Sequence, residues 1–324
     1  MLLKVAIIGC GNIASSYDTK ESPFIYSHAK AFTHNQSTEL IAACDPDKKK
    51  RENFASLWGH DISLYKDIRE LLANHKDIDI LSICSPTELH EEHLTLALYT
   101  DIRYVICEKP LSNNADMGYV SQLVKKYSFA KKYLVVNHIL RWDPAIKKIQ
   151  TEVVKKIQEI QTVNVIYAKG LKHNGIHVVD LTLFFFGEPK KIIKLKETFE
   201  NKDDNNVDFV FLYDEFSVNF SGLLEKNYSI FEYKIYLSNE AIEITNLTNT
   251  IRRFHVVNHE FLKGYKKLST DSTDIETNQD VSMKNVIDDI VNSAINNQPP
   301  SFTPIESLKS LEYIHKINKC KITT

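Results

Sequence analysis

The first 136 residues alternate short apolar runs with stretches in which apolar side chains recur at helical spacing. The runs are rich in Val, Ile and Leu, and several are apolar on both faces: Lys4–Ile8, Leu40–Cys44, Ile78–Cys84, Tyr104–Cys107 and Tyr133–Asn137. A strand that is apolar on both faces is typical of a parallel sheet covered by helices. The intervening stretches, for example Thr87–Tyr99 and Asn113–Tyr127, have the period of helices. This alternation predicts right-handed βαβ units and a doubly wound sheet.

The pattern changes after Asn137. Asp143 and Pro144 begin a predicted helix that runs through Val153, and a second predicted helix, Ile176–Phe186, ends at a Gly with a Pro just beyond. The strand-like runs that remain are Val163–Tyr167, Lys191–Leu195, Asp208–Tyr213, Phe216–Ser221, Phe231–Leu237, Ala241–Thr245 and Ile251–Val257. Period-two alternation with one polar face predicts a mostly antiparallel sheet. Helices on one face would leave the other face for water or a second subunit.

The chain closes with a polar segment and two helices. Lys266–Asp280 is polar and predicts a mobile loop, and helices are predicted around Ser282–Asn296 and Pro304–Ile317. We therefore expect an α/β protein with two domains. Residues 1–136 hold the doubly wound parallel sheet, and residues 137–324 hold a large open, mostly antiparallel sheet. The last helix is expected to pack back on the first domain.

Composition and charge narrow the function classes. The 324 residues include 40 Lys and Arg against 42 Asp and Glu, a formal net charge of -2, which disfavours nucleic acid as a main partner. No apolar run approaches the ~18–20 residues of a membrane span, and the apolar start is too short for a signal peptide. The five cysteines have no paired spacing and mostly lie in or beside apolar runs. This usage indicates a reducing, cytoplasmic setting.

A glycine turn follows the first predicted strand. Residues 9–14, Gly-Cys-Gly-Asn-Ile-Ala, have the pattern G-x-G-x-x-A before a predicted helix. Gly9 allows the tight turn, Gly11 lets the backbone approach a pyrophosphate, and Ala14 lets helix and strand pack closely. Free N–H groups at the start of the helix, where Asn12 and Ile13 lie, would meet the pyrophosphate oxygens. A glycine turn without a ligand is the alternative, which the strand before it and the acid after it disfavour.

That acid is Asp45, at the end of the second predicted strand. An acid at this point accepts both ribose hydroxyls and repels a 2′-phosphate, so NAD is favoured over NADP as the cofactor. It lies 45 − 14 = 31 positions beyond Ala14, whereas ~20 is typical, and an inserted loop at Ser16–Tyr26 accounts for the excess. The cations of Lys48–Arg51 would suit a phosphate, but a solvated first helical turn is the preferred interpretation.

Glu108-Lys109-Pro110 is the first candidate catalytic segment, because it follows a predicted strand directly. Open α/β sheets bind ligands at the carboxyl ends of their strands. A lysine placed there beside a desolvated nicotinamide can have a lowered pKa and shuttle a proton. A plain surface lysine after a strand is common, so the tripeptide alone is weak support.

Residues 172–180, Lys-His-Asn-Gly-Ile-His-Val-Val-Asp, form the second candidate segment. At a helix start, His173, His177 and Asp180 would share one face, because positions three and four apart are neighbours. A lone histidine is more often a core or capping residue, but three polar groups ahead of an apolar helix favour a site. Neither this segment nor His90-Glu-Glu-His93 has H-E-x-x-H spacing or a cysteine pair, so no metal site is expected. Nor does a G-x-S-x-G elbow or a P-loop favour a hydrolase or a kinase.

Taken in order, these motifs resemble the glucose–fructose oxidoreductase / inositol dehydrogenase (Gfo/Idh/MocA) family. They are the Gly9–Ala14 turn, Asp45, residues 85–90 (Ser-Pro-Thr-Glu-Leu-His), Glu108-Lys-Pro110, Asn137 to Pro144, and Gly175 to Asp180. The resemblance covers most of the chain. It implies an NAD(P)-binding Rossmann domain over residues 1–136 and a substrate-binding and oligomerisation domain over residues 137–324. The open sheet of the second domain is then the contact of a homodimer or homotetramer.

The resemblance also implies residue roles. Lys109 matches the family's catalytic lysine, His177 its active-site histidine, and Asp180 the acid one turn later. Cofactor contacts are implied for Gly9, Gly11, Asn12, Ile13, Asp45, Ser85, Pro86, Thr87, His90, Glu108 and Lys109. Substrate contacts are implied for Asn137, Arg141, His173, Asn174 and Asp180. His173 departs from many family sugar dehydrogenases, which carry an acid there.

The expected reaction is hydride transfer between the nicotinamide and a carbinol or ketone carbon of a sugar, sugar derivative or nucleotide sugar, with Lys109 and His177 as the proton relay. The His-Asn-Gly-x-His form resembles members associated with surface-glycan and nucleotide-sugar synthesis. Arg141 suits a diphosphate or serves in a structural ion pair. Two alternatives stay open: a non-catalytic NAD-binding sensor on the same fold, and a reductase of a non-sugar ring. The presence of both Lys109 and His177 disfavours the sensor.

Overall fold

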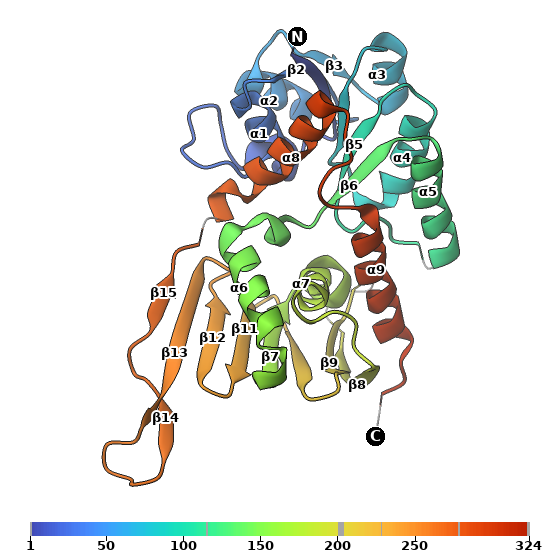
Figure 1. The fold of residues 1–324 in the computed structure, drawn as a ribbon. Coiled ribbons are helices and arrows are strands. Elements are labelled where there is room, and N and C mark those ends of the chain that lie inside the picture. Colours follow the sequence, from blue (N-terminus) through green and yellow to red (C-terminus); the bar gives the residue numbers. More distant parts are fainter. Residues whose placement is uncertain (1, 115, 200–203, 228, 278, 323–324) are drawn as a thin grey trace. The chain divides into compact units, whose positions relative to one another are not determined.

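The computed structural model describes residues 2–114, 116–199, 204–227, 229–277 and 279–322. They form two compact units. The first comprises residues up to Trp142 together with Asp280–Leu311, and the second comprises Asp143–Gln279 and the residues from Glu312 onward. The α/β class is confirmed, because each unit is built on its own sheet with helices against it (Figure 1).

The sheet of the first unit is parallel, with strand order β3-β2-β1-β4-β5-β6 (Figure 1). Its strands are β1 (Leu3–Ile8), β2 (Thr38–Cys44), β3 (Ser63–Tyr65), β4 (Ile80–Ile83), β5 (Tyr104–Glu108) and β6 (Tyr133–Asn137). Every residue of β4 and β5 is buried, as the apolar runs predict. The short edge strand β3 was not predicted, because three half-buried residues give no periodic signal.

Helices cover both faces of this sheet. They are α1 (His28–His34), α2 (Lys48–Trp58), α3 (Ile68–Asn74), α4 (His90–Leu98), α5 (Met117–Phe129) and α8 (Ser282–Asn296). Alternate residues of β1 enter different cores: Val5 and Ile7 pack with α1, α2 and α8, whereas Ala6 and Ile8 pack with α3, α4 and α5. The doubly wound prediction is confirmed. The carboxyl ends of neighbouring strands β1, β4 and β5 consequently meet at one edge.

The sheet of the second unit is mostly antiparallel, as predicted. Its strand order is β14-β13-β12-β11-β7-β10-β9-β8, with β15 beside β13. Among the described strands of this sheet, only β7 and β10 form a parallel pair. Its strands are β7 (Ile160–Ala168), β8 (Lys191–Thr198), β9 (Asn206–Leu212), β10 (Ser217–Leu223), β11 (Phe231–Leu237), β12 (Glu240–Thr245), β13 (Thr250–Asn258), β14 (Lys266–Leu268) and β15 (Thr273–Ile275). The predicted mobile loop at Lys266–Asp280 is therefore wrong for β14 and β15. Backbone pairing with β13 requires no apolar side chains, so a polar segment can still form edge strands.

Helices α6 (Pro144–Lys155) and α7 (Ile176–Phe186) lie across one face of this sheet (Figure 1). Tyr233 of β11 joins α7 to the sheet, because its buried hydroxyl bonds the hydroxyl of Thr182 and the carbonyl of Val178. α7 ends at Gly187, whose φ of 73° suits glycine, as its sequence predicts. The helix α9 (Pro304–Lys319) contributes residues to both units.

The division of the chain differs from the expected boundary at residue 136. Residues 137–142 stay with the first unit, because the short turn η3 (Ile139–Trp142) packs on α8, and Asn285 of α8 donates to the carbonyl of Trp142 at 3.0 Å. α8 and the start of α9 also belong to the first unit. Among the described residues, no helix is both long and apolar enough to cross a membrane.

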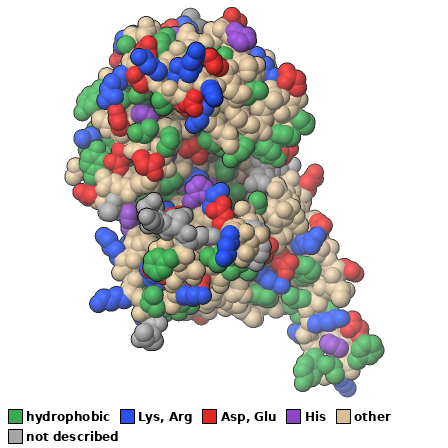
Figure 2. All heavy atoms as spheres, turned by 180° about the vertical axis from the view of Figure 1, so that it is seen from behind, with side chains coloured by type: hydrophobic (Ala, Val, Ile, Leu, Met, Phe, Trp, Pro, Cys, Tyr) green, Lys and Arg blue, Asp and Glu red, His purple; other side chains and the backbone are tan. Residues whose placement is uncertain are grey.

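The hairpin of β13 and β14 carries apolar side chains at its tip. Phe261 is 89% exposed, and Leu262 and Tyr265 are exposed beside it. Figure 2 shows hydrophobic side chains gathered at the end of this projecting hairpin.

Candidate active site

The glycine turn at the end of β1 has the geometry that its sequence predicts. Gly9 has a φ of +91°, and a Cβ there would lie 2.8 Å from the carbonyl oxygen of Cys84, so another residue would be both strained and too close. A Cβ on Gly11 would meet nothing within 4 Å, which leaves its backbone open to a ligand. Ala14 is fully buried, as close packing requires.

The segment after the turn differs from the prediction of a helix. It is a single helical turn, η1 (Asn12–Ser16), and a loop then leads to α1. Asp18 anchors that loop by accepting bonds from the backbone N–H groups of Tyr26 (2.6 Å) and Ser27 (3.0 Å). The loop is the inserted segment that the late position of Asp45 predicts. Because this loop begins directly after Ser16, the helical segment that follows the glycine turn has only one turn.

Asp45 lies directly against the glycine turn. One carboxylate oxygen accepts the N–H of Cys10 at 2.9 Å, and the other accepts the N–H of Asp47 at 2.9 Å. These bonds hold the acid 7% exposed at the carboxyl end of β2. The carboxylate is therefore held in one position beside the glycine turn.

A cavity of about 250 Å³ opens beside Asp45 in the first unit. Four predicted cofactor residues line it: Gly9, Asp45, Ser85 and Pro86. The predicted residues Gly11, Asn12, Ile13, Thr87, His90, Glu108 and Lys109 are not among its lining residues. Unpredicted lining residues include Lys50, Lys66, Asp67, Arg69, Glu92 and His93.

Three cations line this cavity, Lys50 of α2 with Lys66 and Arg69. Lys48, Lys49 and Lys50 are exposed, which matches the predicted solvated first turn. Arg51 instead donates to the carbonyl of Asp45 at 2.6 Å and so braces the turn that holds the acid. The open glycine turn, the fixed carboxylate and the adjacent cavity together fit an adenine dinucleotide.

Glu108 and Lys109 lie at the carboxyl end of β5, on the same sheet edge as the glycine turn. The Glu108 carboxylate receives three hydrogen bonds. Oε1 accepts from Asn137 Nδ2 at 2.7 Å and contacts His28 Nε2 at 2.9 Å, and Oε2 accepts from the backbone N–H of Lys109 at 3.3 Å. Glu108 is thus turned into the protein, where it holds the backbone of Lys109. The side chain of Lys109 is half-buried.

His28 continues this network toward β4. It is fully buried, and its Nδ1 lies 2.8 Å from the hydroxyl of Ser82, which in turn contacts the sulfur of Cys84. Burial lowers the pKa of His28, but Cys84 and the Glu108 carboxylate outweigh burial and raise it. Burial correspondingly raises the pKa of Glu108, but the bonds from His28 and Asn137 outweigh it and lower that pKa.

His90 and His93 are structural contacts of the 85–90 motif. The ring nitrogens of His90 lie 2.9 Å from the carbonyl of Ser85 and 2.8 Å from the carbonyl of Pro110, so His90 ties this motif to the Lys109 segment. His93 Nδ1 lies 2.9 Å from the hydroxyl of Ser85, and burial lowers the pKa of His93 to about 4. The described residues contain no group of three or more metal-ligating side chains.

The second candidate segment lies in the second unit. His177 and Asp180 are on α7, three positions apart, with His177 half-buried and Asp180 2% exposed. His173 and Asn174 lie in the preceding turn, η5 (Gly170–Gly175), and not on the helix. A face shared by His173, His177 and Asp180 stays a prediction, with His173 in the turn that leads directly into α7.

Asp204 fixes the turn that carries His173, and the sequence analysis missed it. Its two carboxylate oxygens accept the backbone N–H groups of Lys172 at 2.7 Å and His173 at 2.8 Å. A Cβ on Gly170, whose φ is +79°, would collide with this carboxylate at 2.2 Å. The glycine before the segment is the one signal that a tight contact lies there.

Asn137 and Arg141 are both in the first unit. Asn137 Oδ1 is buried and has no hydrogen-bond partner among the described residues, although Nδ2 bonds Glu108. Arg141 is 9% exposed, and its guanidinium lies 4.9 Å from the ring centre of Phe302. This cation–π contact helps to hold the guanidinium in place.

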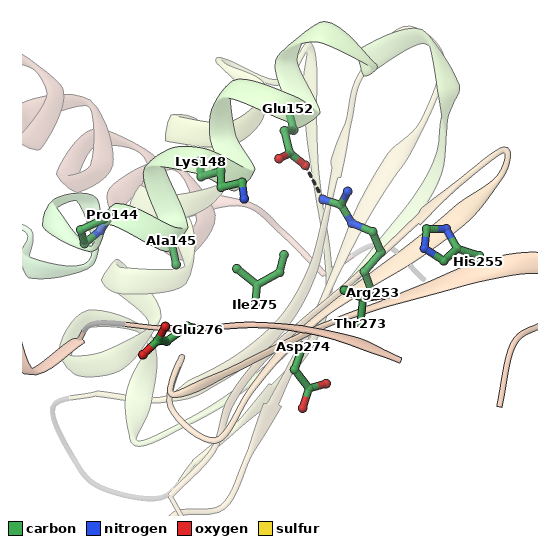
Figure 3. Close-up of a pocket in the computed structure, with 10 residues that line it drawn as sticks. All are labelled: Pro144, Ala145, Lys148, Glu152, Arg253, His255, Thr273, Asp274, Ile275 and Glu276. Atoms are coloured by element: carbon green, nitrogen blue, oxygen red, sulfur yellow. Dashed lines mark hydrogen bonds and ion pairs between the residues drawn. The ribbon is translucent and has the colours of Figure 1, made fainter. Parts of the chain in front are cut away.

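The second unit has a separate depression of about 490 Å³ between α6 and the strands β13 and β15 (Figure 3). Two of its charged lining residues, Arg253 and Glu152, pair with each other. Figure 3 shows the guanidinium of Arg253 turned toward Glu152, and the same side chain also lies 3.3 Å from Glu240. These contacts join α6 to the sheet.

Comparisons with known proteins agree with this geometry. Residues 3–138 match the sequence model of the GFO_IDH_MocA family, described as "Oxidoreductase family, NAD-binding Rossmann fold". The chain is 33% identical over 108 residues to D-glucoside 3-dehydrogenase of Escherichia coli, a match that covers 33% of this chain and 27% of the relative. It is 30% identical over 145 residues to scyllo-inositol 2-dehydrogenase (NADP(+)) IolW of Bacillus subtilis, covering 38% and 39%. The matched segments thus span less than half of these relatives.

Solved structures show the same fold over nearly the whole chain. The WlbA dehydrogenase from Bordetella pertussis, in complex with NADH and UDP-GlcNAcA, superposes with a TM-score of 0.75 at 15% identity, covering 98% of this chain and 95% of that one. The resemblance that the motifs carry is confirmed. Residues 3–138, which hold the parallel sheet, match the NAD-binding Rossmann domain of the Gfo/Idh/MocA oxidoreductase family.

Proposed function

We propose that the chain is an NAD(P)-dependent oxidoreductase that transfers a hydride between the nicotinamide and a carbinol or ketone carbon of a sugar, a sugar derivative or a nucleotide sugar. One observation carries the proposal. Lys109 directly follows β5, which lies two strands from β1 in the sheet, so Lys109 is on the same sheet edge as the glycine turn. A lysine at that edge is in the region where a dinucleotide presents its reactive ring.

The cofactor would be held by residues that the geometry already fixes. Gly9 and Gly11 leave the backbone open to the pyrophosphate, and the Asp45 carboxylate would accept the adenosine ribose hydroxyls. The nicotinamide supplies the hydride acceptor or donor. Asp45 favours NAD over NADP, although Lys50 and Lys66 line the same cavity and would attract a phosphate.

Proton transfer is the work of this chain's own side chains. As the carbinol C–H bond breaks with its electron pair, the hydroxyl proton passes to Lys109, with His177 as its partner in the relay. The carbon–oxygen double bond forms in the same step, and the reverse sequence reduces a ketone. Asp180, His173, Asn174, Asn137 and Arg141 would orient the hydroxyl groups of the substrate.

The names of the relatives support a polyhydroxylated substrate, because one acts as a D-glucoside 3-dehydrogenase and another as a scyllo-inositol 2-dehydrogenase. Arg141 adds the nucleotide-sugar possibility, since the planar fork of a guanidinium suits a diphosphate. A second copy of the chain would pack on the face of the second sheet opposite α6 and α7. The free cysteines fit a reducing cytoplasm.

The experiment is a panel of free sugars, inositols and nucleotide sugars with NAD or NADP, followed by absorbance of the reduced nicotinamide. Turnover of one substrate class supports the proposal and names the class. If no compound of the panel is oxidised or reduced, and fluorescence shows that NADH binds tightly, the proposal is overturned. The non-catalytic NAD-binding sensor is then favoured.

A further inference from the structure

The position of Lys109 depends on a buried carboxylate next to it in the sequence. Glu108 accepts the backbone N–H of Lys109 while its other oxygen is held from α1 by His28 and from β6 by Asn137. Two elements distant in sequence, together with the neighbouring residue, thus fix one carboxylate. Any shift of the Glu108 side chain would move the backbone from which Lys109 projects.

The same carboxylate places a negative charge one residue from Lys109. Glu108 is 9% exposed, so water screens this charge weakly. An isolated negative charge there would stabilise the ammonium form of Lys109 and disfavour its taking a proton. A compensating positive charge would remove this stabilisation of the ammonium form.

His28 is placed to supply that charge. Its Nε2 lies 2.9 Å from Glu108. Ser82 of β4 bonds its other ring nitrogen, the titratable Cys84 follows β4 beside Ser82, and Asn137 faces Glu108 from β6. In the doubly protonated form, Nδ1–H donates to Ser82 and the Ser82 hydroxyl donates to Cys84. Every ring hydrogen then has an acceptor.

We propose that His28 is a positioning residue for Lys109: as a buried imidazolium it neutralises Glu108, fixes the carboxylate that holds the Lys109 backbone, and leaves the Lys109 amine able to take a proton. This inference rests on the role given to Lys109 in the proposed function. His28 acts through Glu108 and touches neither substrate nor cofactor in this scheme.

The test measures the titration of Lys109 without turnover. Lysines are dimethylated with ¹³C, which preserves their charge, and the Lys109 signal is identified by its loss in Lys109→Arg. In His28→Gln an amide N–H still bonds Glu108 but the positive charge is gone, so the midpoint of Lys109 is expected to rise by about one pH unit. Removing the carboxylate as well, in His28→Gln/Glu108→Gln, is expected to return the midpoint to the wild-type value.

His34→Gln is the matched control, because His34 is exposed on the same helix α1 and is expected to leave the midpoint unchanged. A purely structural role for His28 predicts no restoration in the double variant. An unchanged midpoint in His28→Gln, or no restoration, overturns the inference.

A measurement on the unmodified protein covers the case in which the variants fail to fold. ¹⁵N spectra of the histidines at about pH 8, where an ordinary imidazole is neutral, are expected to show both ring nitrogens of His28 protonated. A neutral His28 would overturn the inference. Neither experiment needs a substrate. If no panel compound reacts but the titrations are as expected, the proposed reaction is rejected, whereas the effect of His28 on the titration of Lys109 is supported.

Discussion

The carboxylate of Asp45 accepts the backbone N–H of Cys10 at 2.9 Å, across 35 positions of sequence. This bond joins the end of β2 to the glycine turn after β1. It fixes both the acid that would choose between NAD and NADP and the backbone that would hold the pyrophosphate. We therefore expect cofactor choice to depend on this side chain.

Replacing Asp45 by Asn is expected to raise the affinity for NADPH relative to NADH by roughly 10–100-fold, because the charge that repels a 2′-phosphate is lost while Lys50 and Lys66 remain. Fluorescence titration with the two reduced cofactors measures the ratio. Asp47→Asn is the control, since Asp47 is an exposed acid that caps α2. An equal change of the ratio in both variants would show that overall charge, and not Asp45, decides.

His93 is expected to make stability depend on pH in the acid range. Burial lowers its pKa to about 4, so between about pH 6.5 and 4 the unfolded chain binds a proton that the folded chain does not. The free energy of unfolding should therefore fall as the pH falls through this window, by about 2–3 kcal/mol from this residue.

His93→Gln removes this proton, so the difference in unfolding free energy between pH 7 and pH 4 should shrink by a similar amount. Urea denaturation at several pH values measures it. His34→Gln, an exposed histidine, serves as the control. A variant with the same pH dependence as the wild type would be inconsistent with a neutral, buried His93.

Arg253 is expected to contribute to the stability of the second unit. It pairs with Glu152 and with Glu240, whose side chain is only 8% exposed and would be left with fewer partners. Arg253→Ala should lower the free energy of unfolding by about 2–4 kcal/mol. Its neighbour Arg252 has an exposed pair with Asp274 at 3.6 Å, so Arg252→Ala should cost less than about 1 kcal/mol. Equal losses in thermal or urea unfolding would contradict this assignment.

The sequence predicts much of the fold because apolar periodicity is local. The runs Tyr133–Asn137 and Phe231–Leu237 coincide with β6 and β11, and Ser282–Asn296 coincides with α8. The edge strand β15 was missed, since its residues owe their conformation to backbone bonds with β13 and not to their own pattern.

The candidate site could be predicted only where a residue lies in a motif. Lys109 follows a strand, and His177 begins a helix, so both have local signals. His28 has none, because its contact with Glu108 spans 80 positions and arises only when α1 packs beside β5. Asp204 is similar, since it meets the turn of His173 from a distant loop.

The central claim is that Lys109 moves the proton that accompanies hydride transfer. The most direct measurement is kcat/KM of Lys109→Ala with the best substrate of the panel, alongside its affinity for NADH. The account predicts a loss of about 10²–10⁴-fold in kcat/KM with NADH affinity within a few-fold of the wild type. Full activity in Lys109→Ala would contradict it.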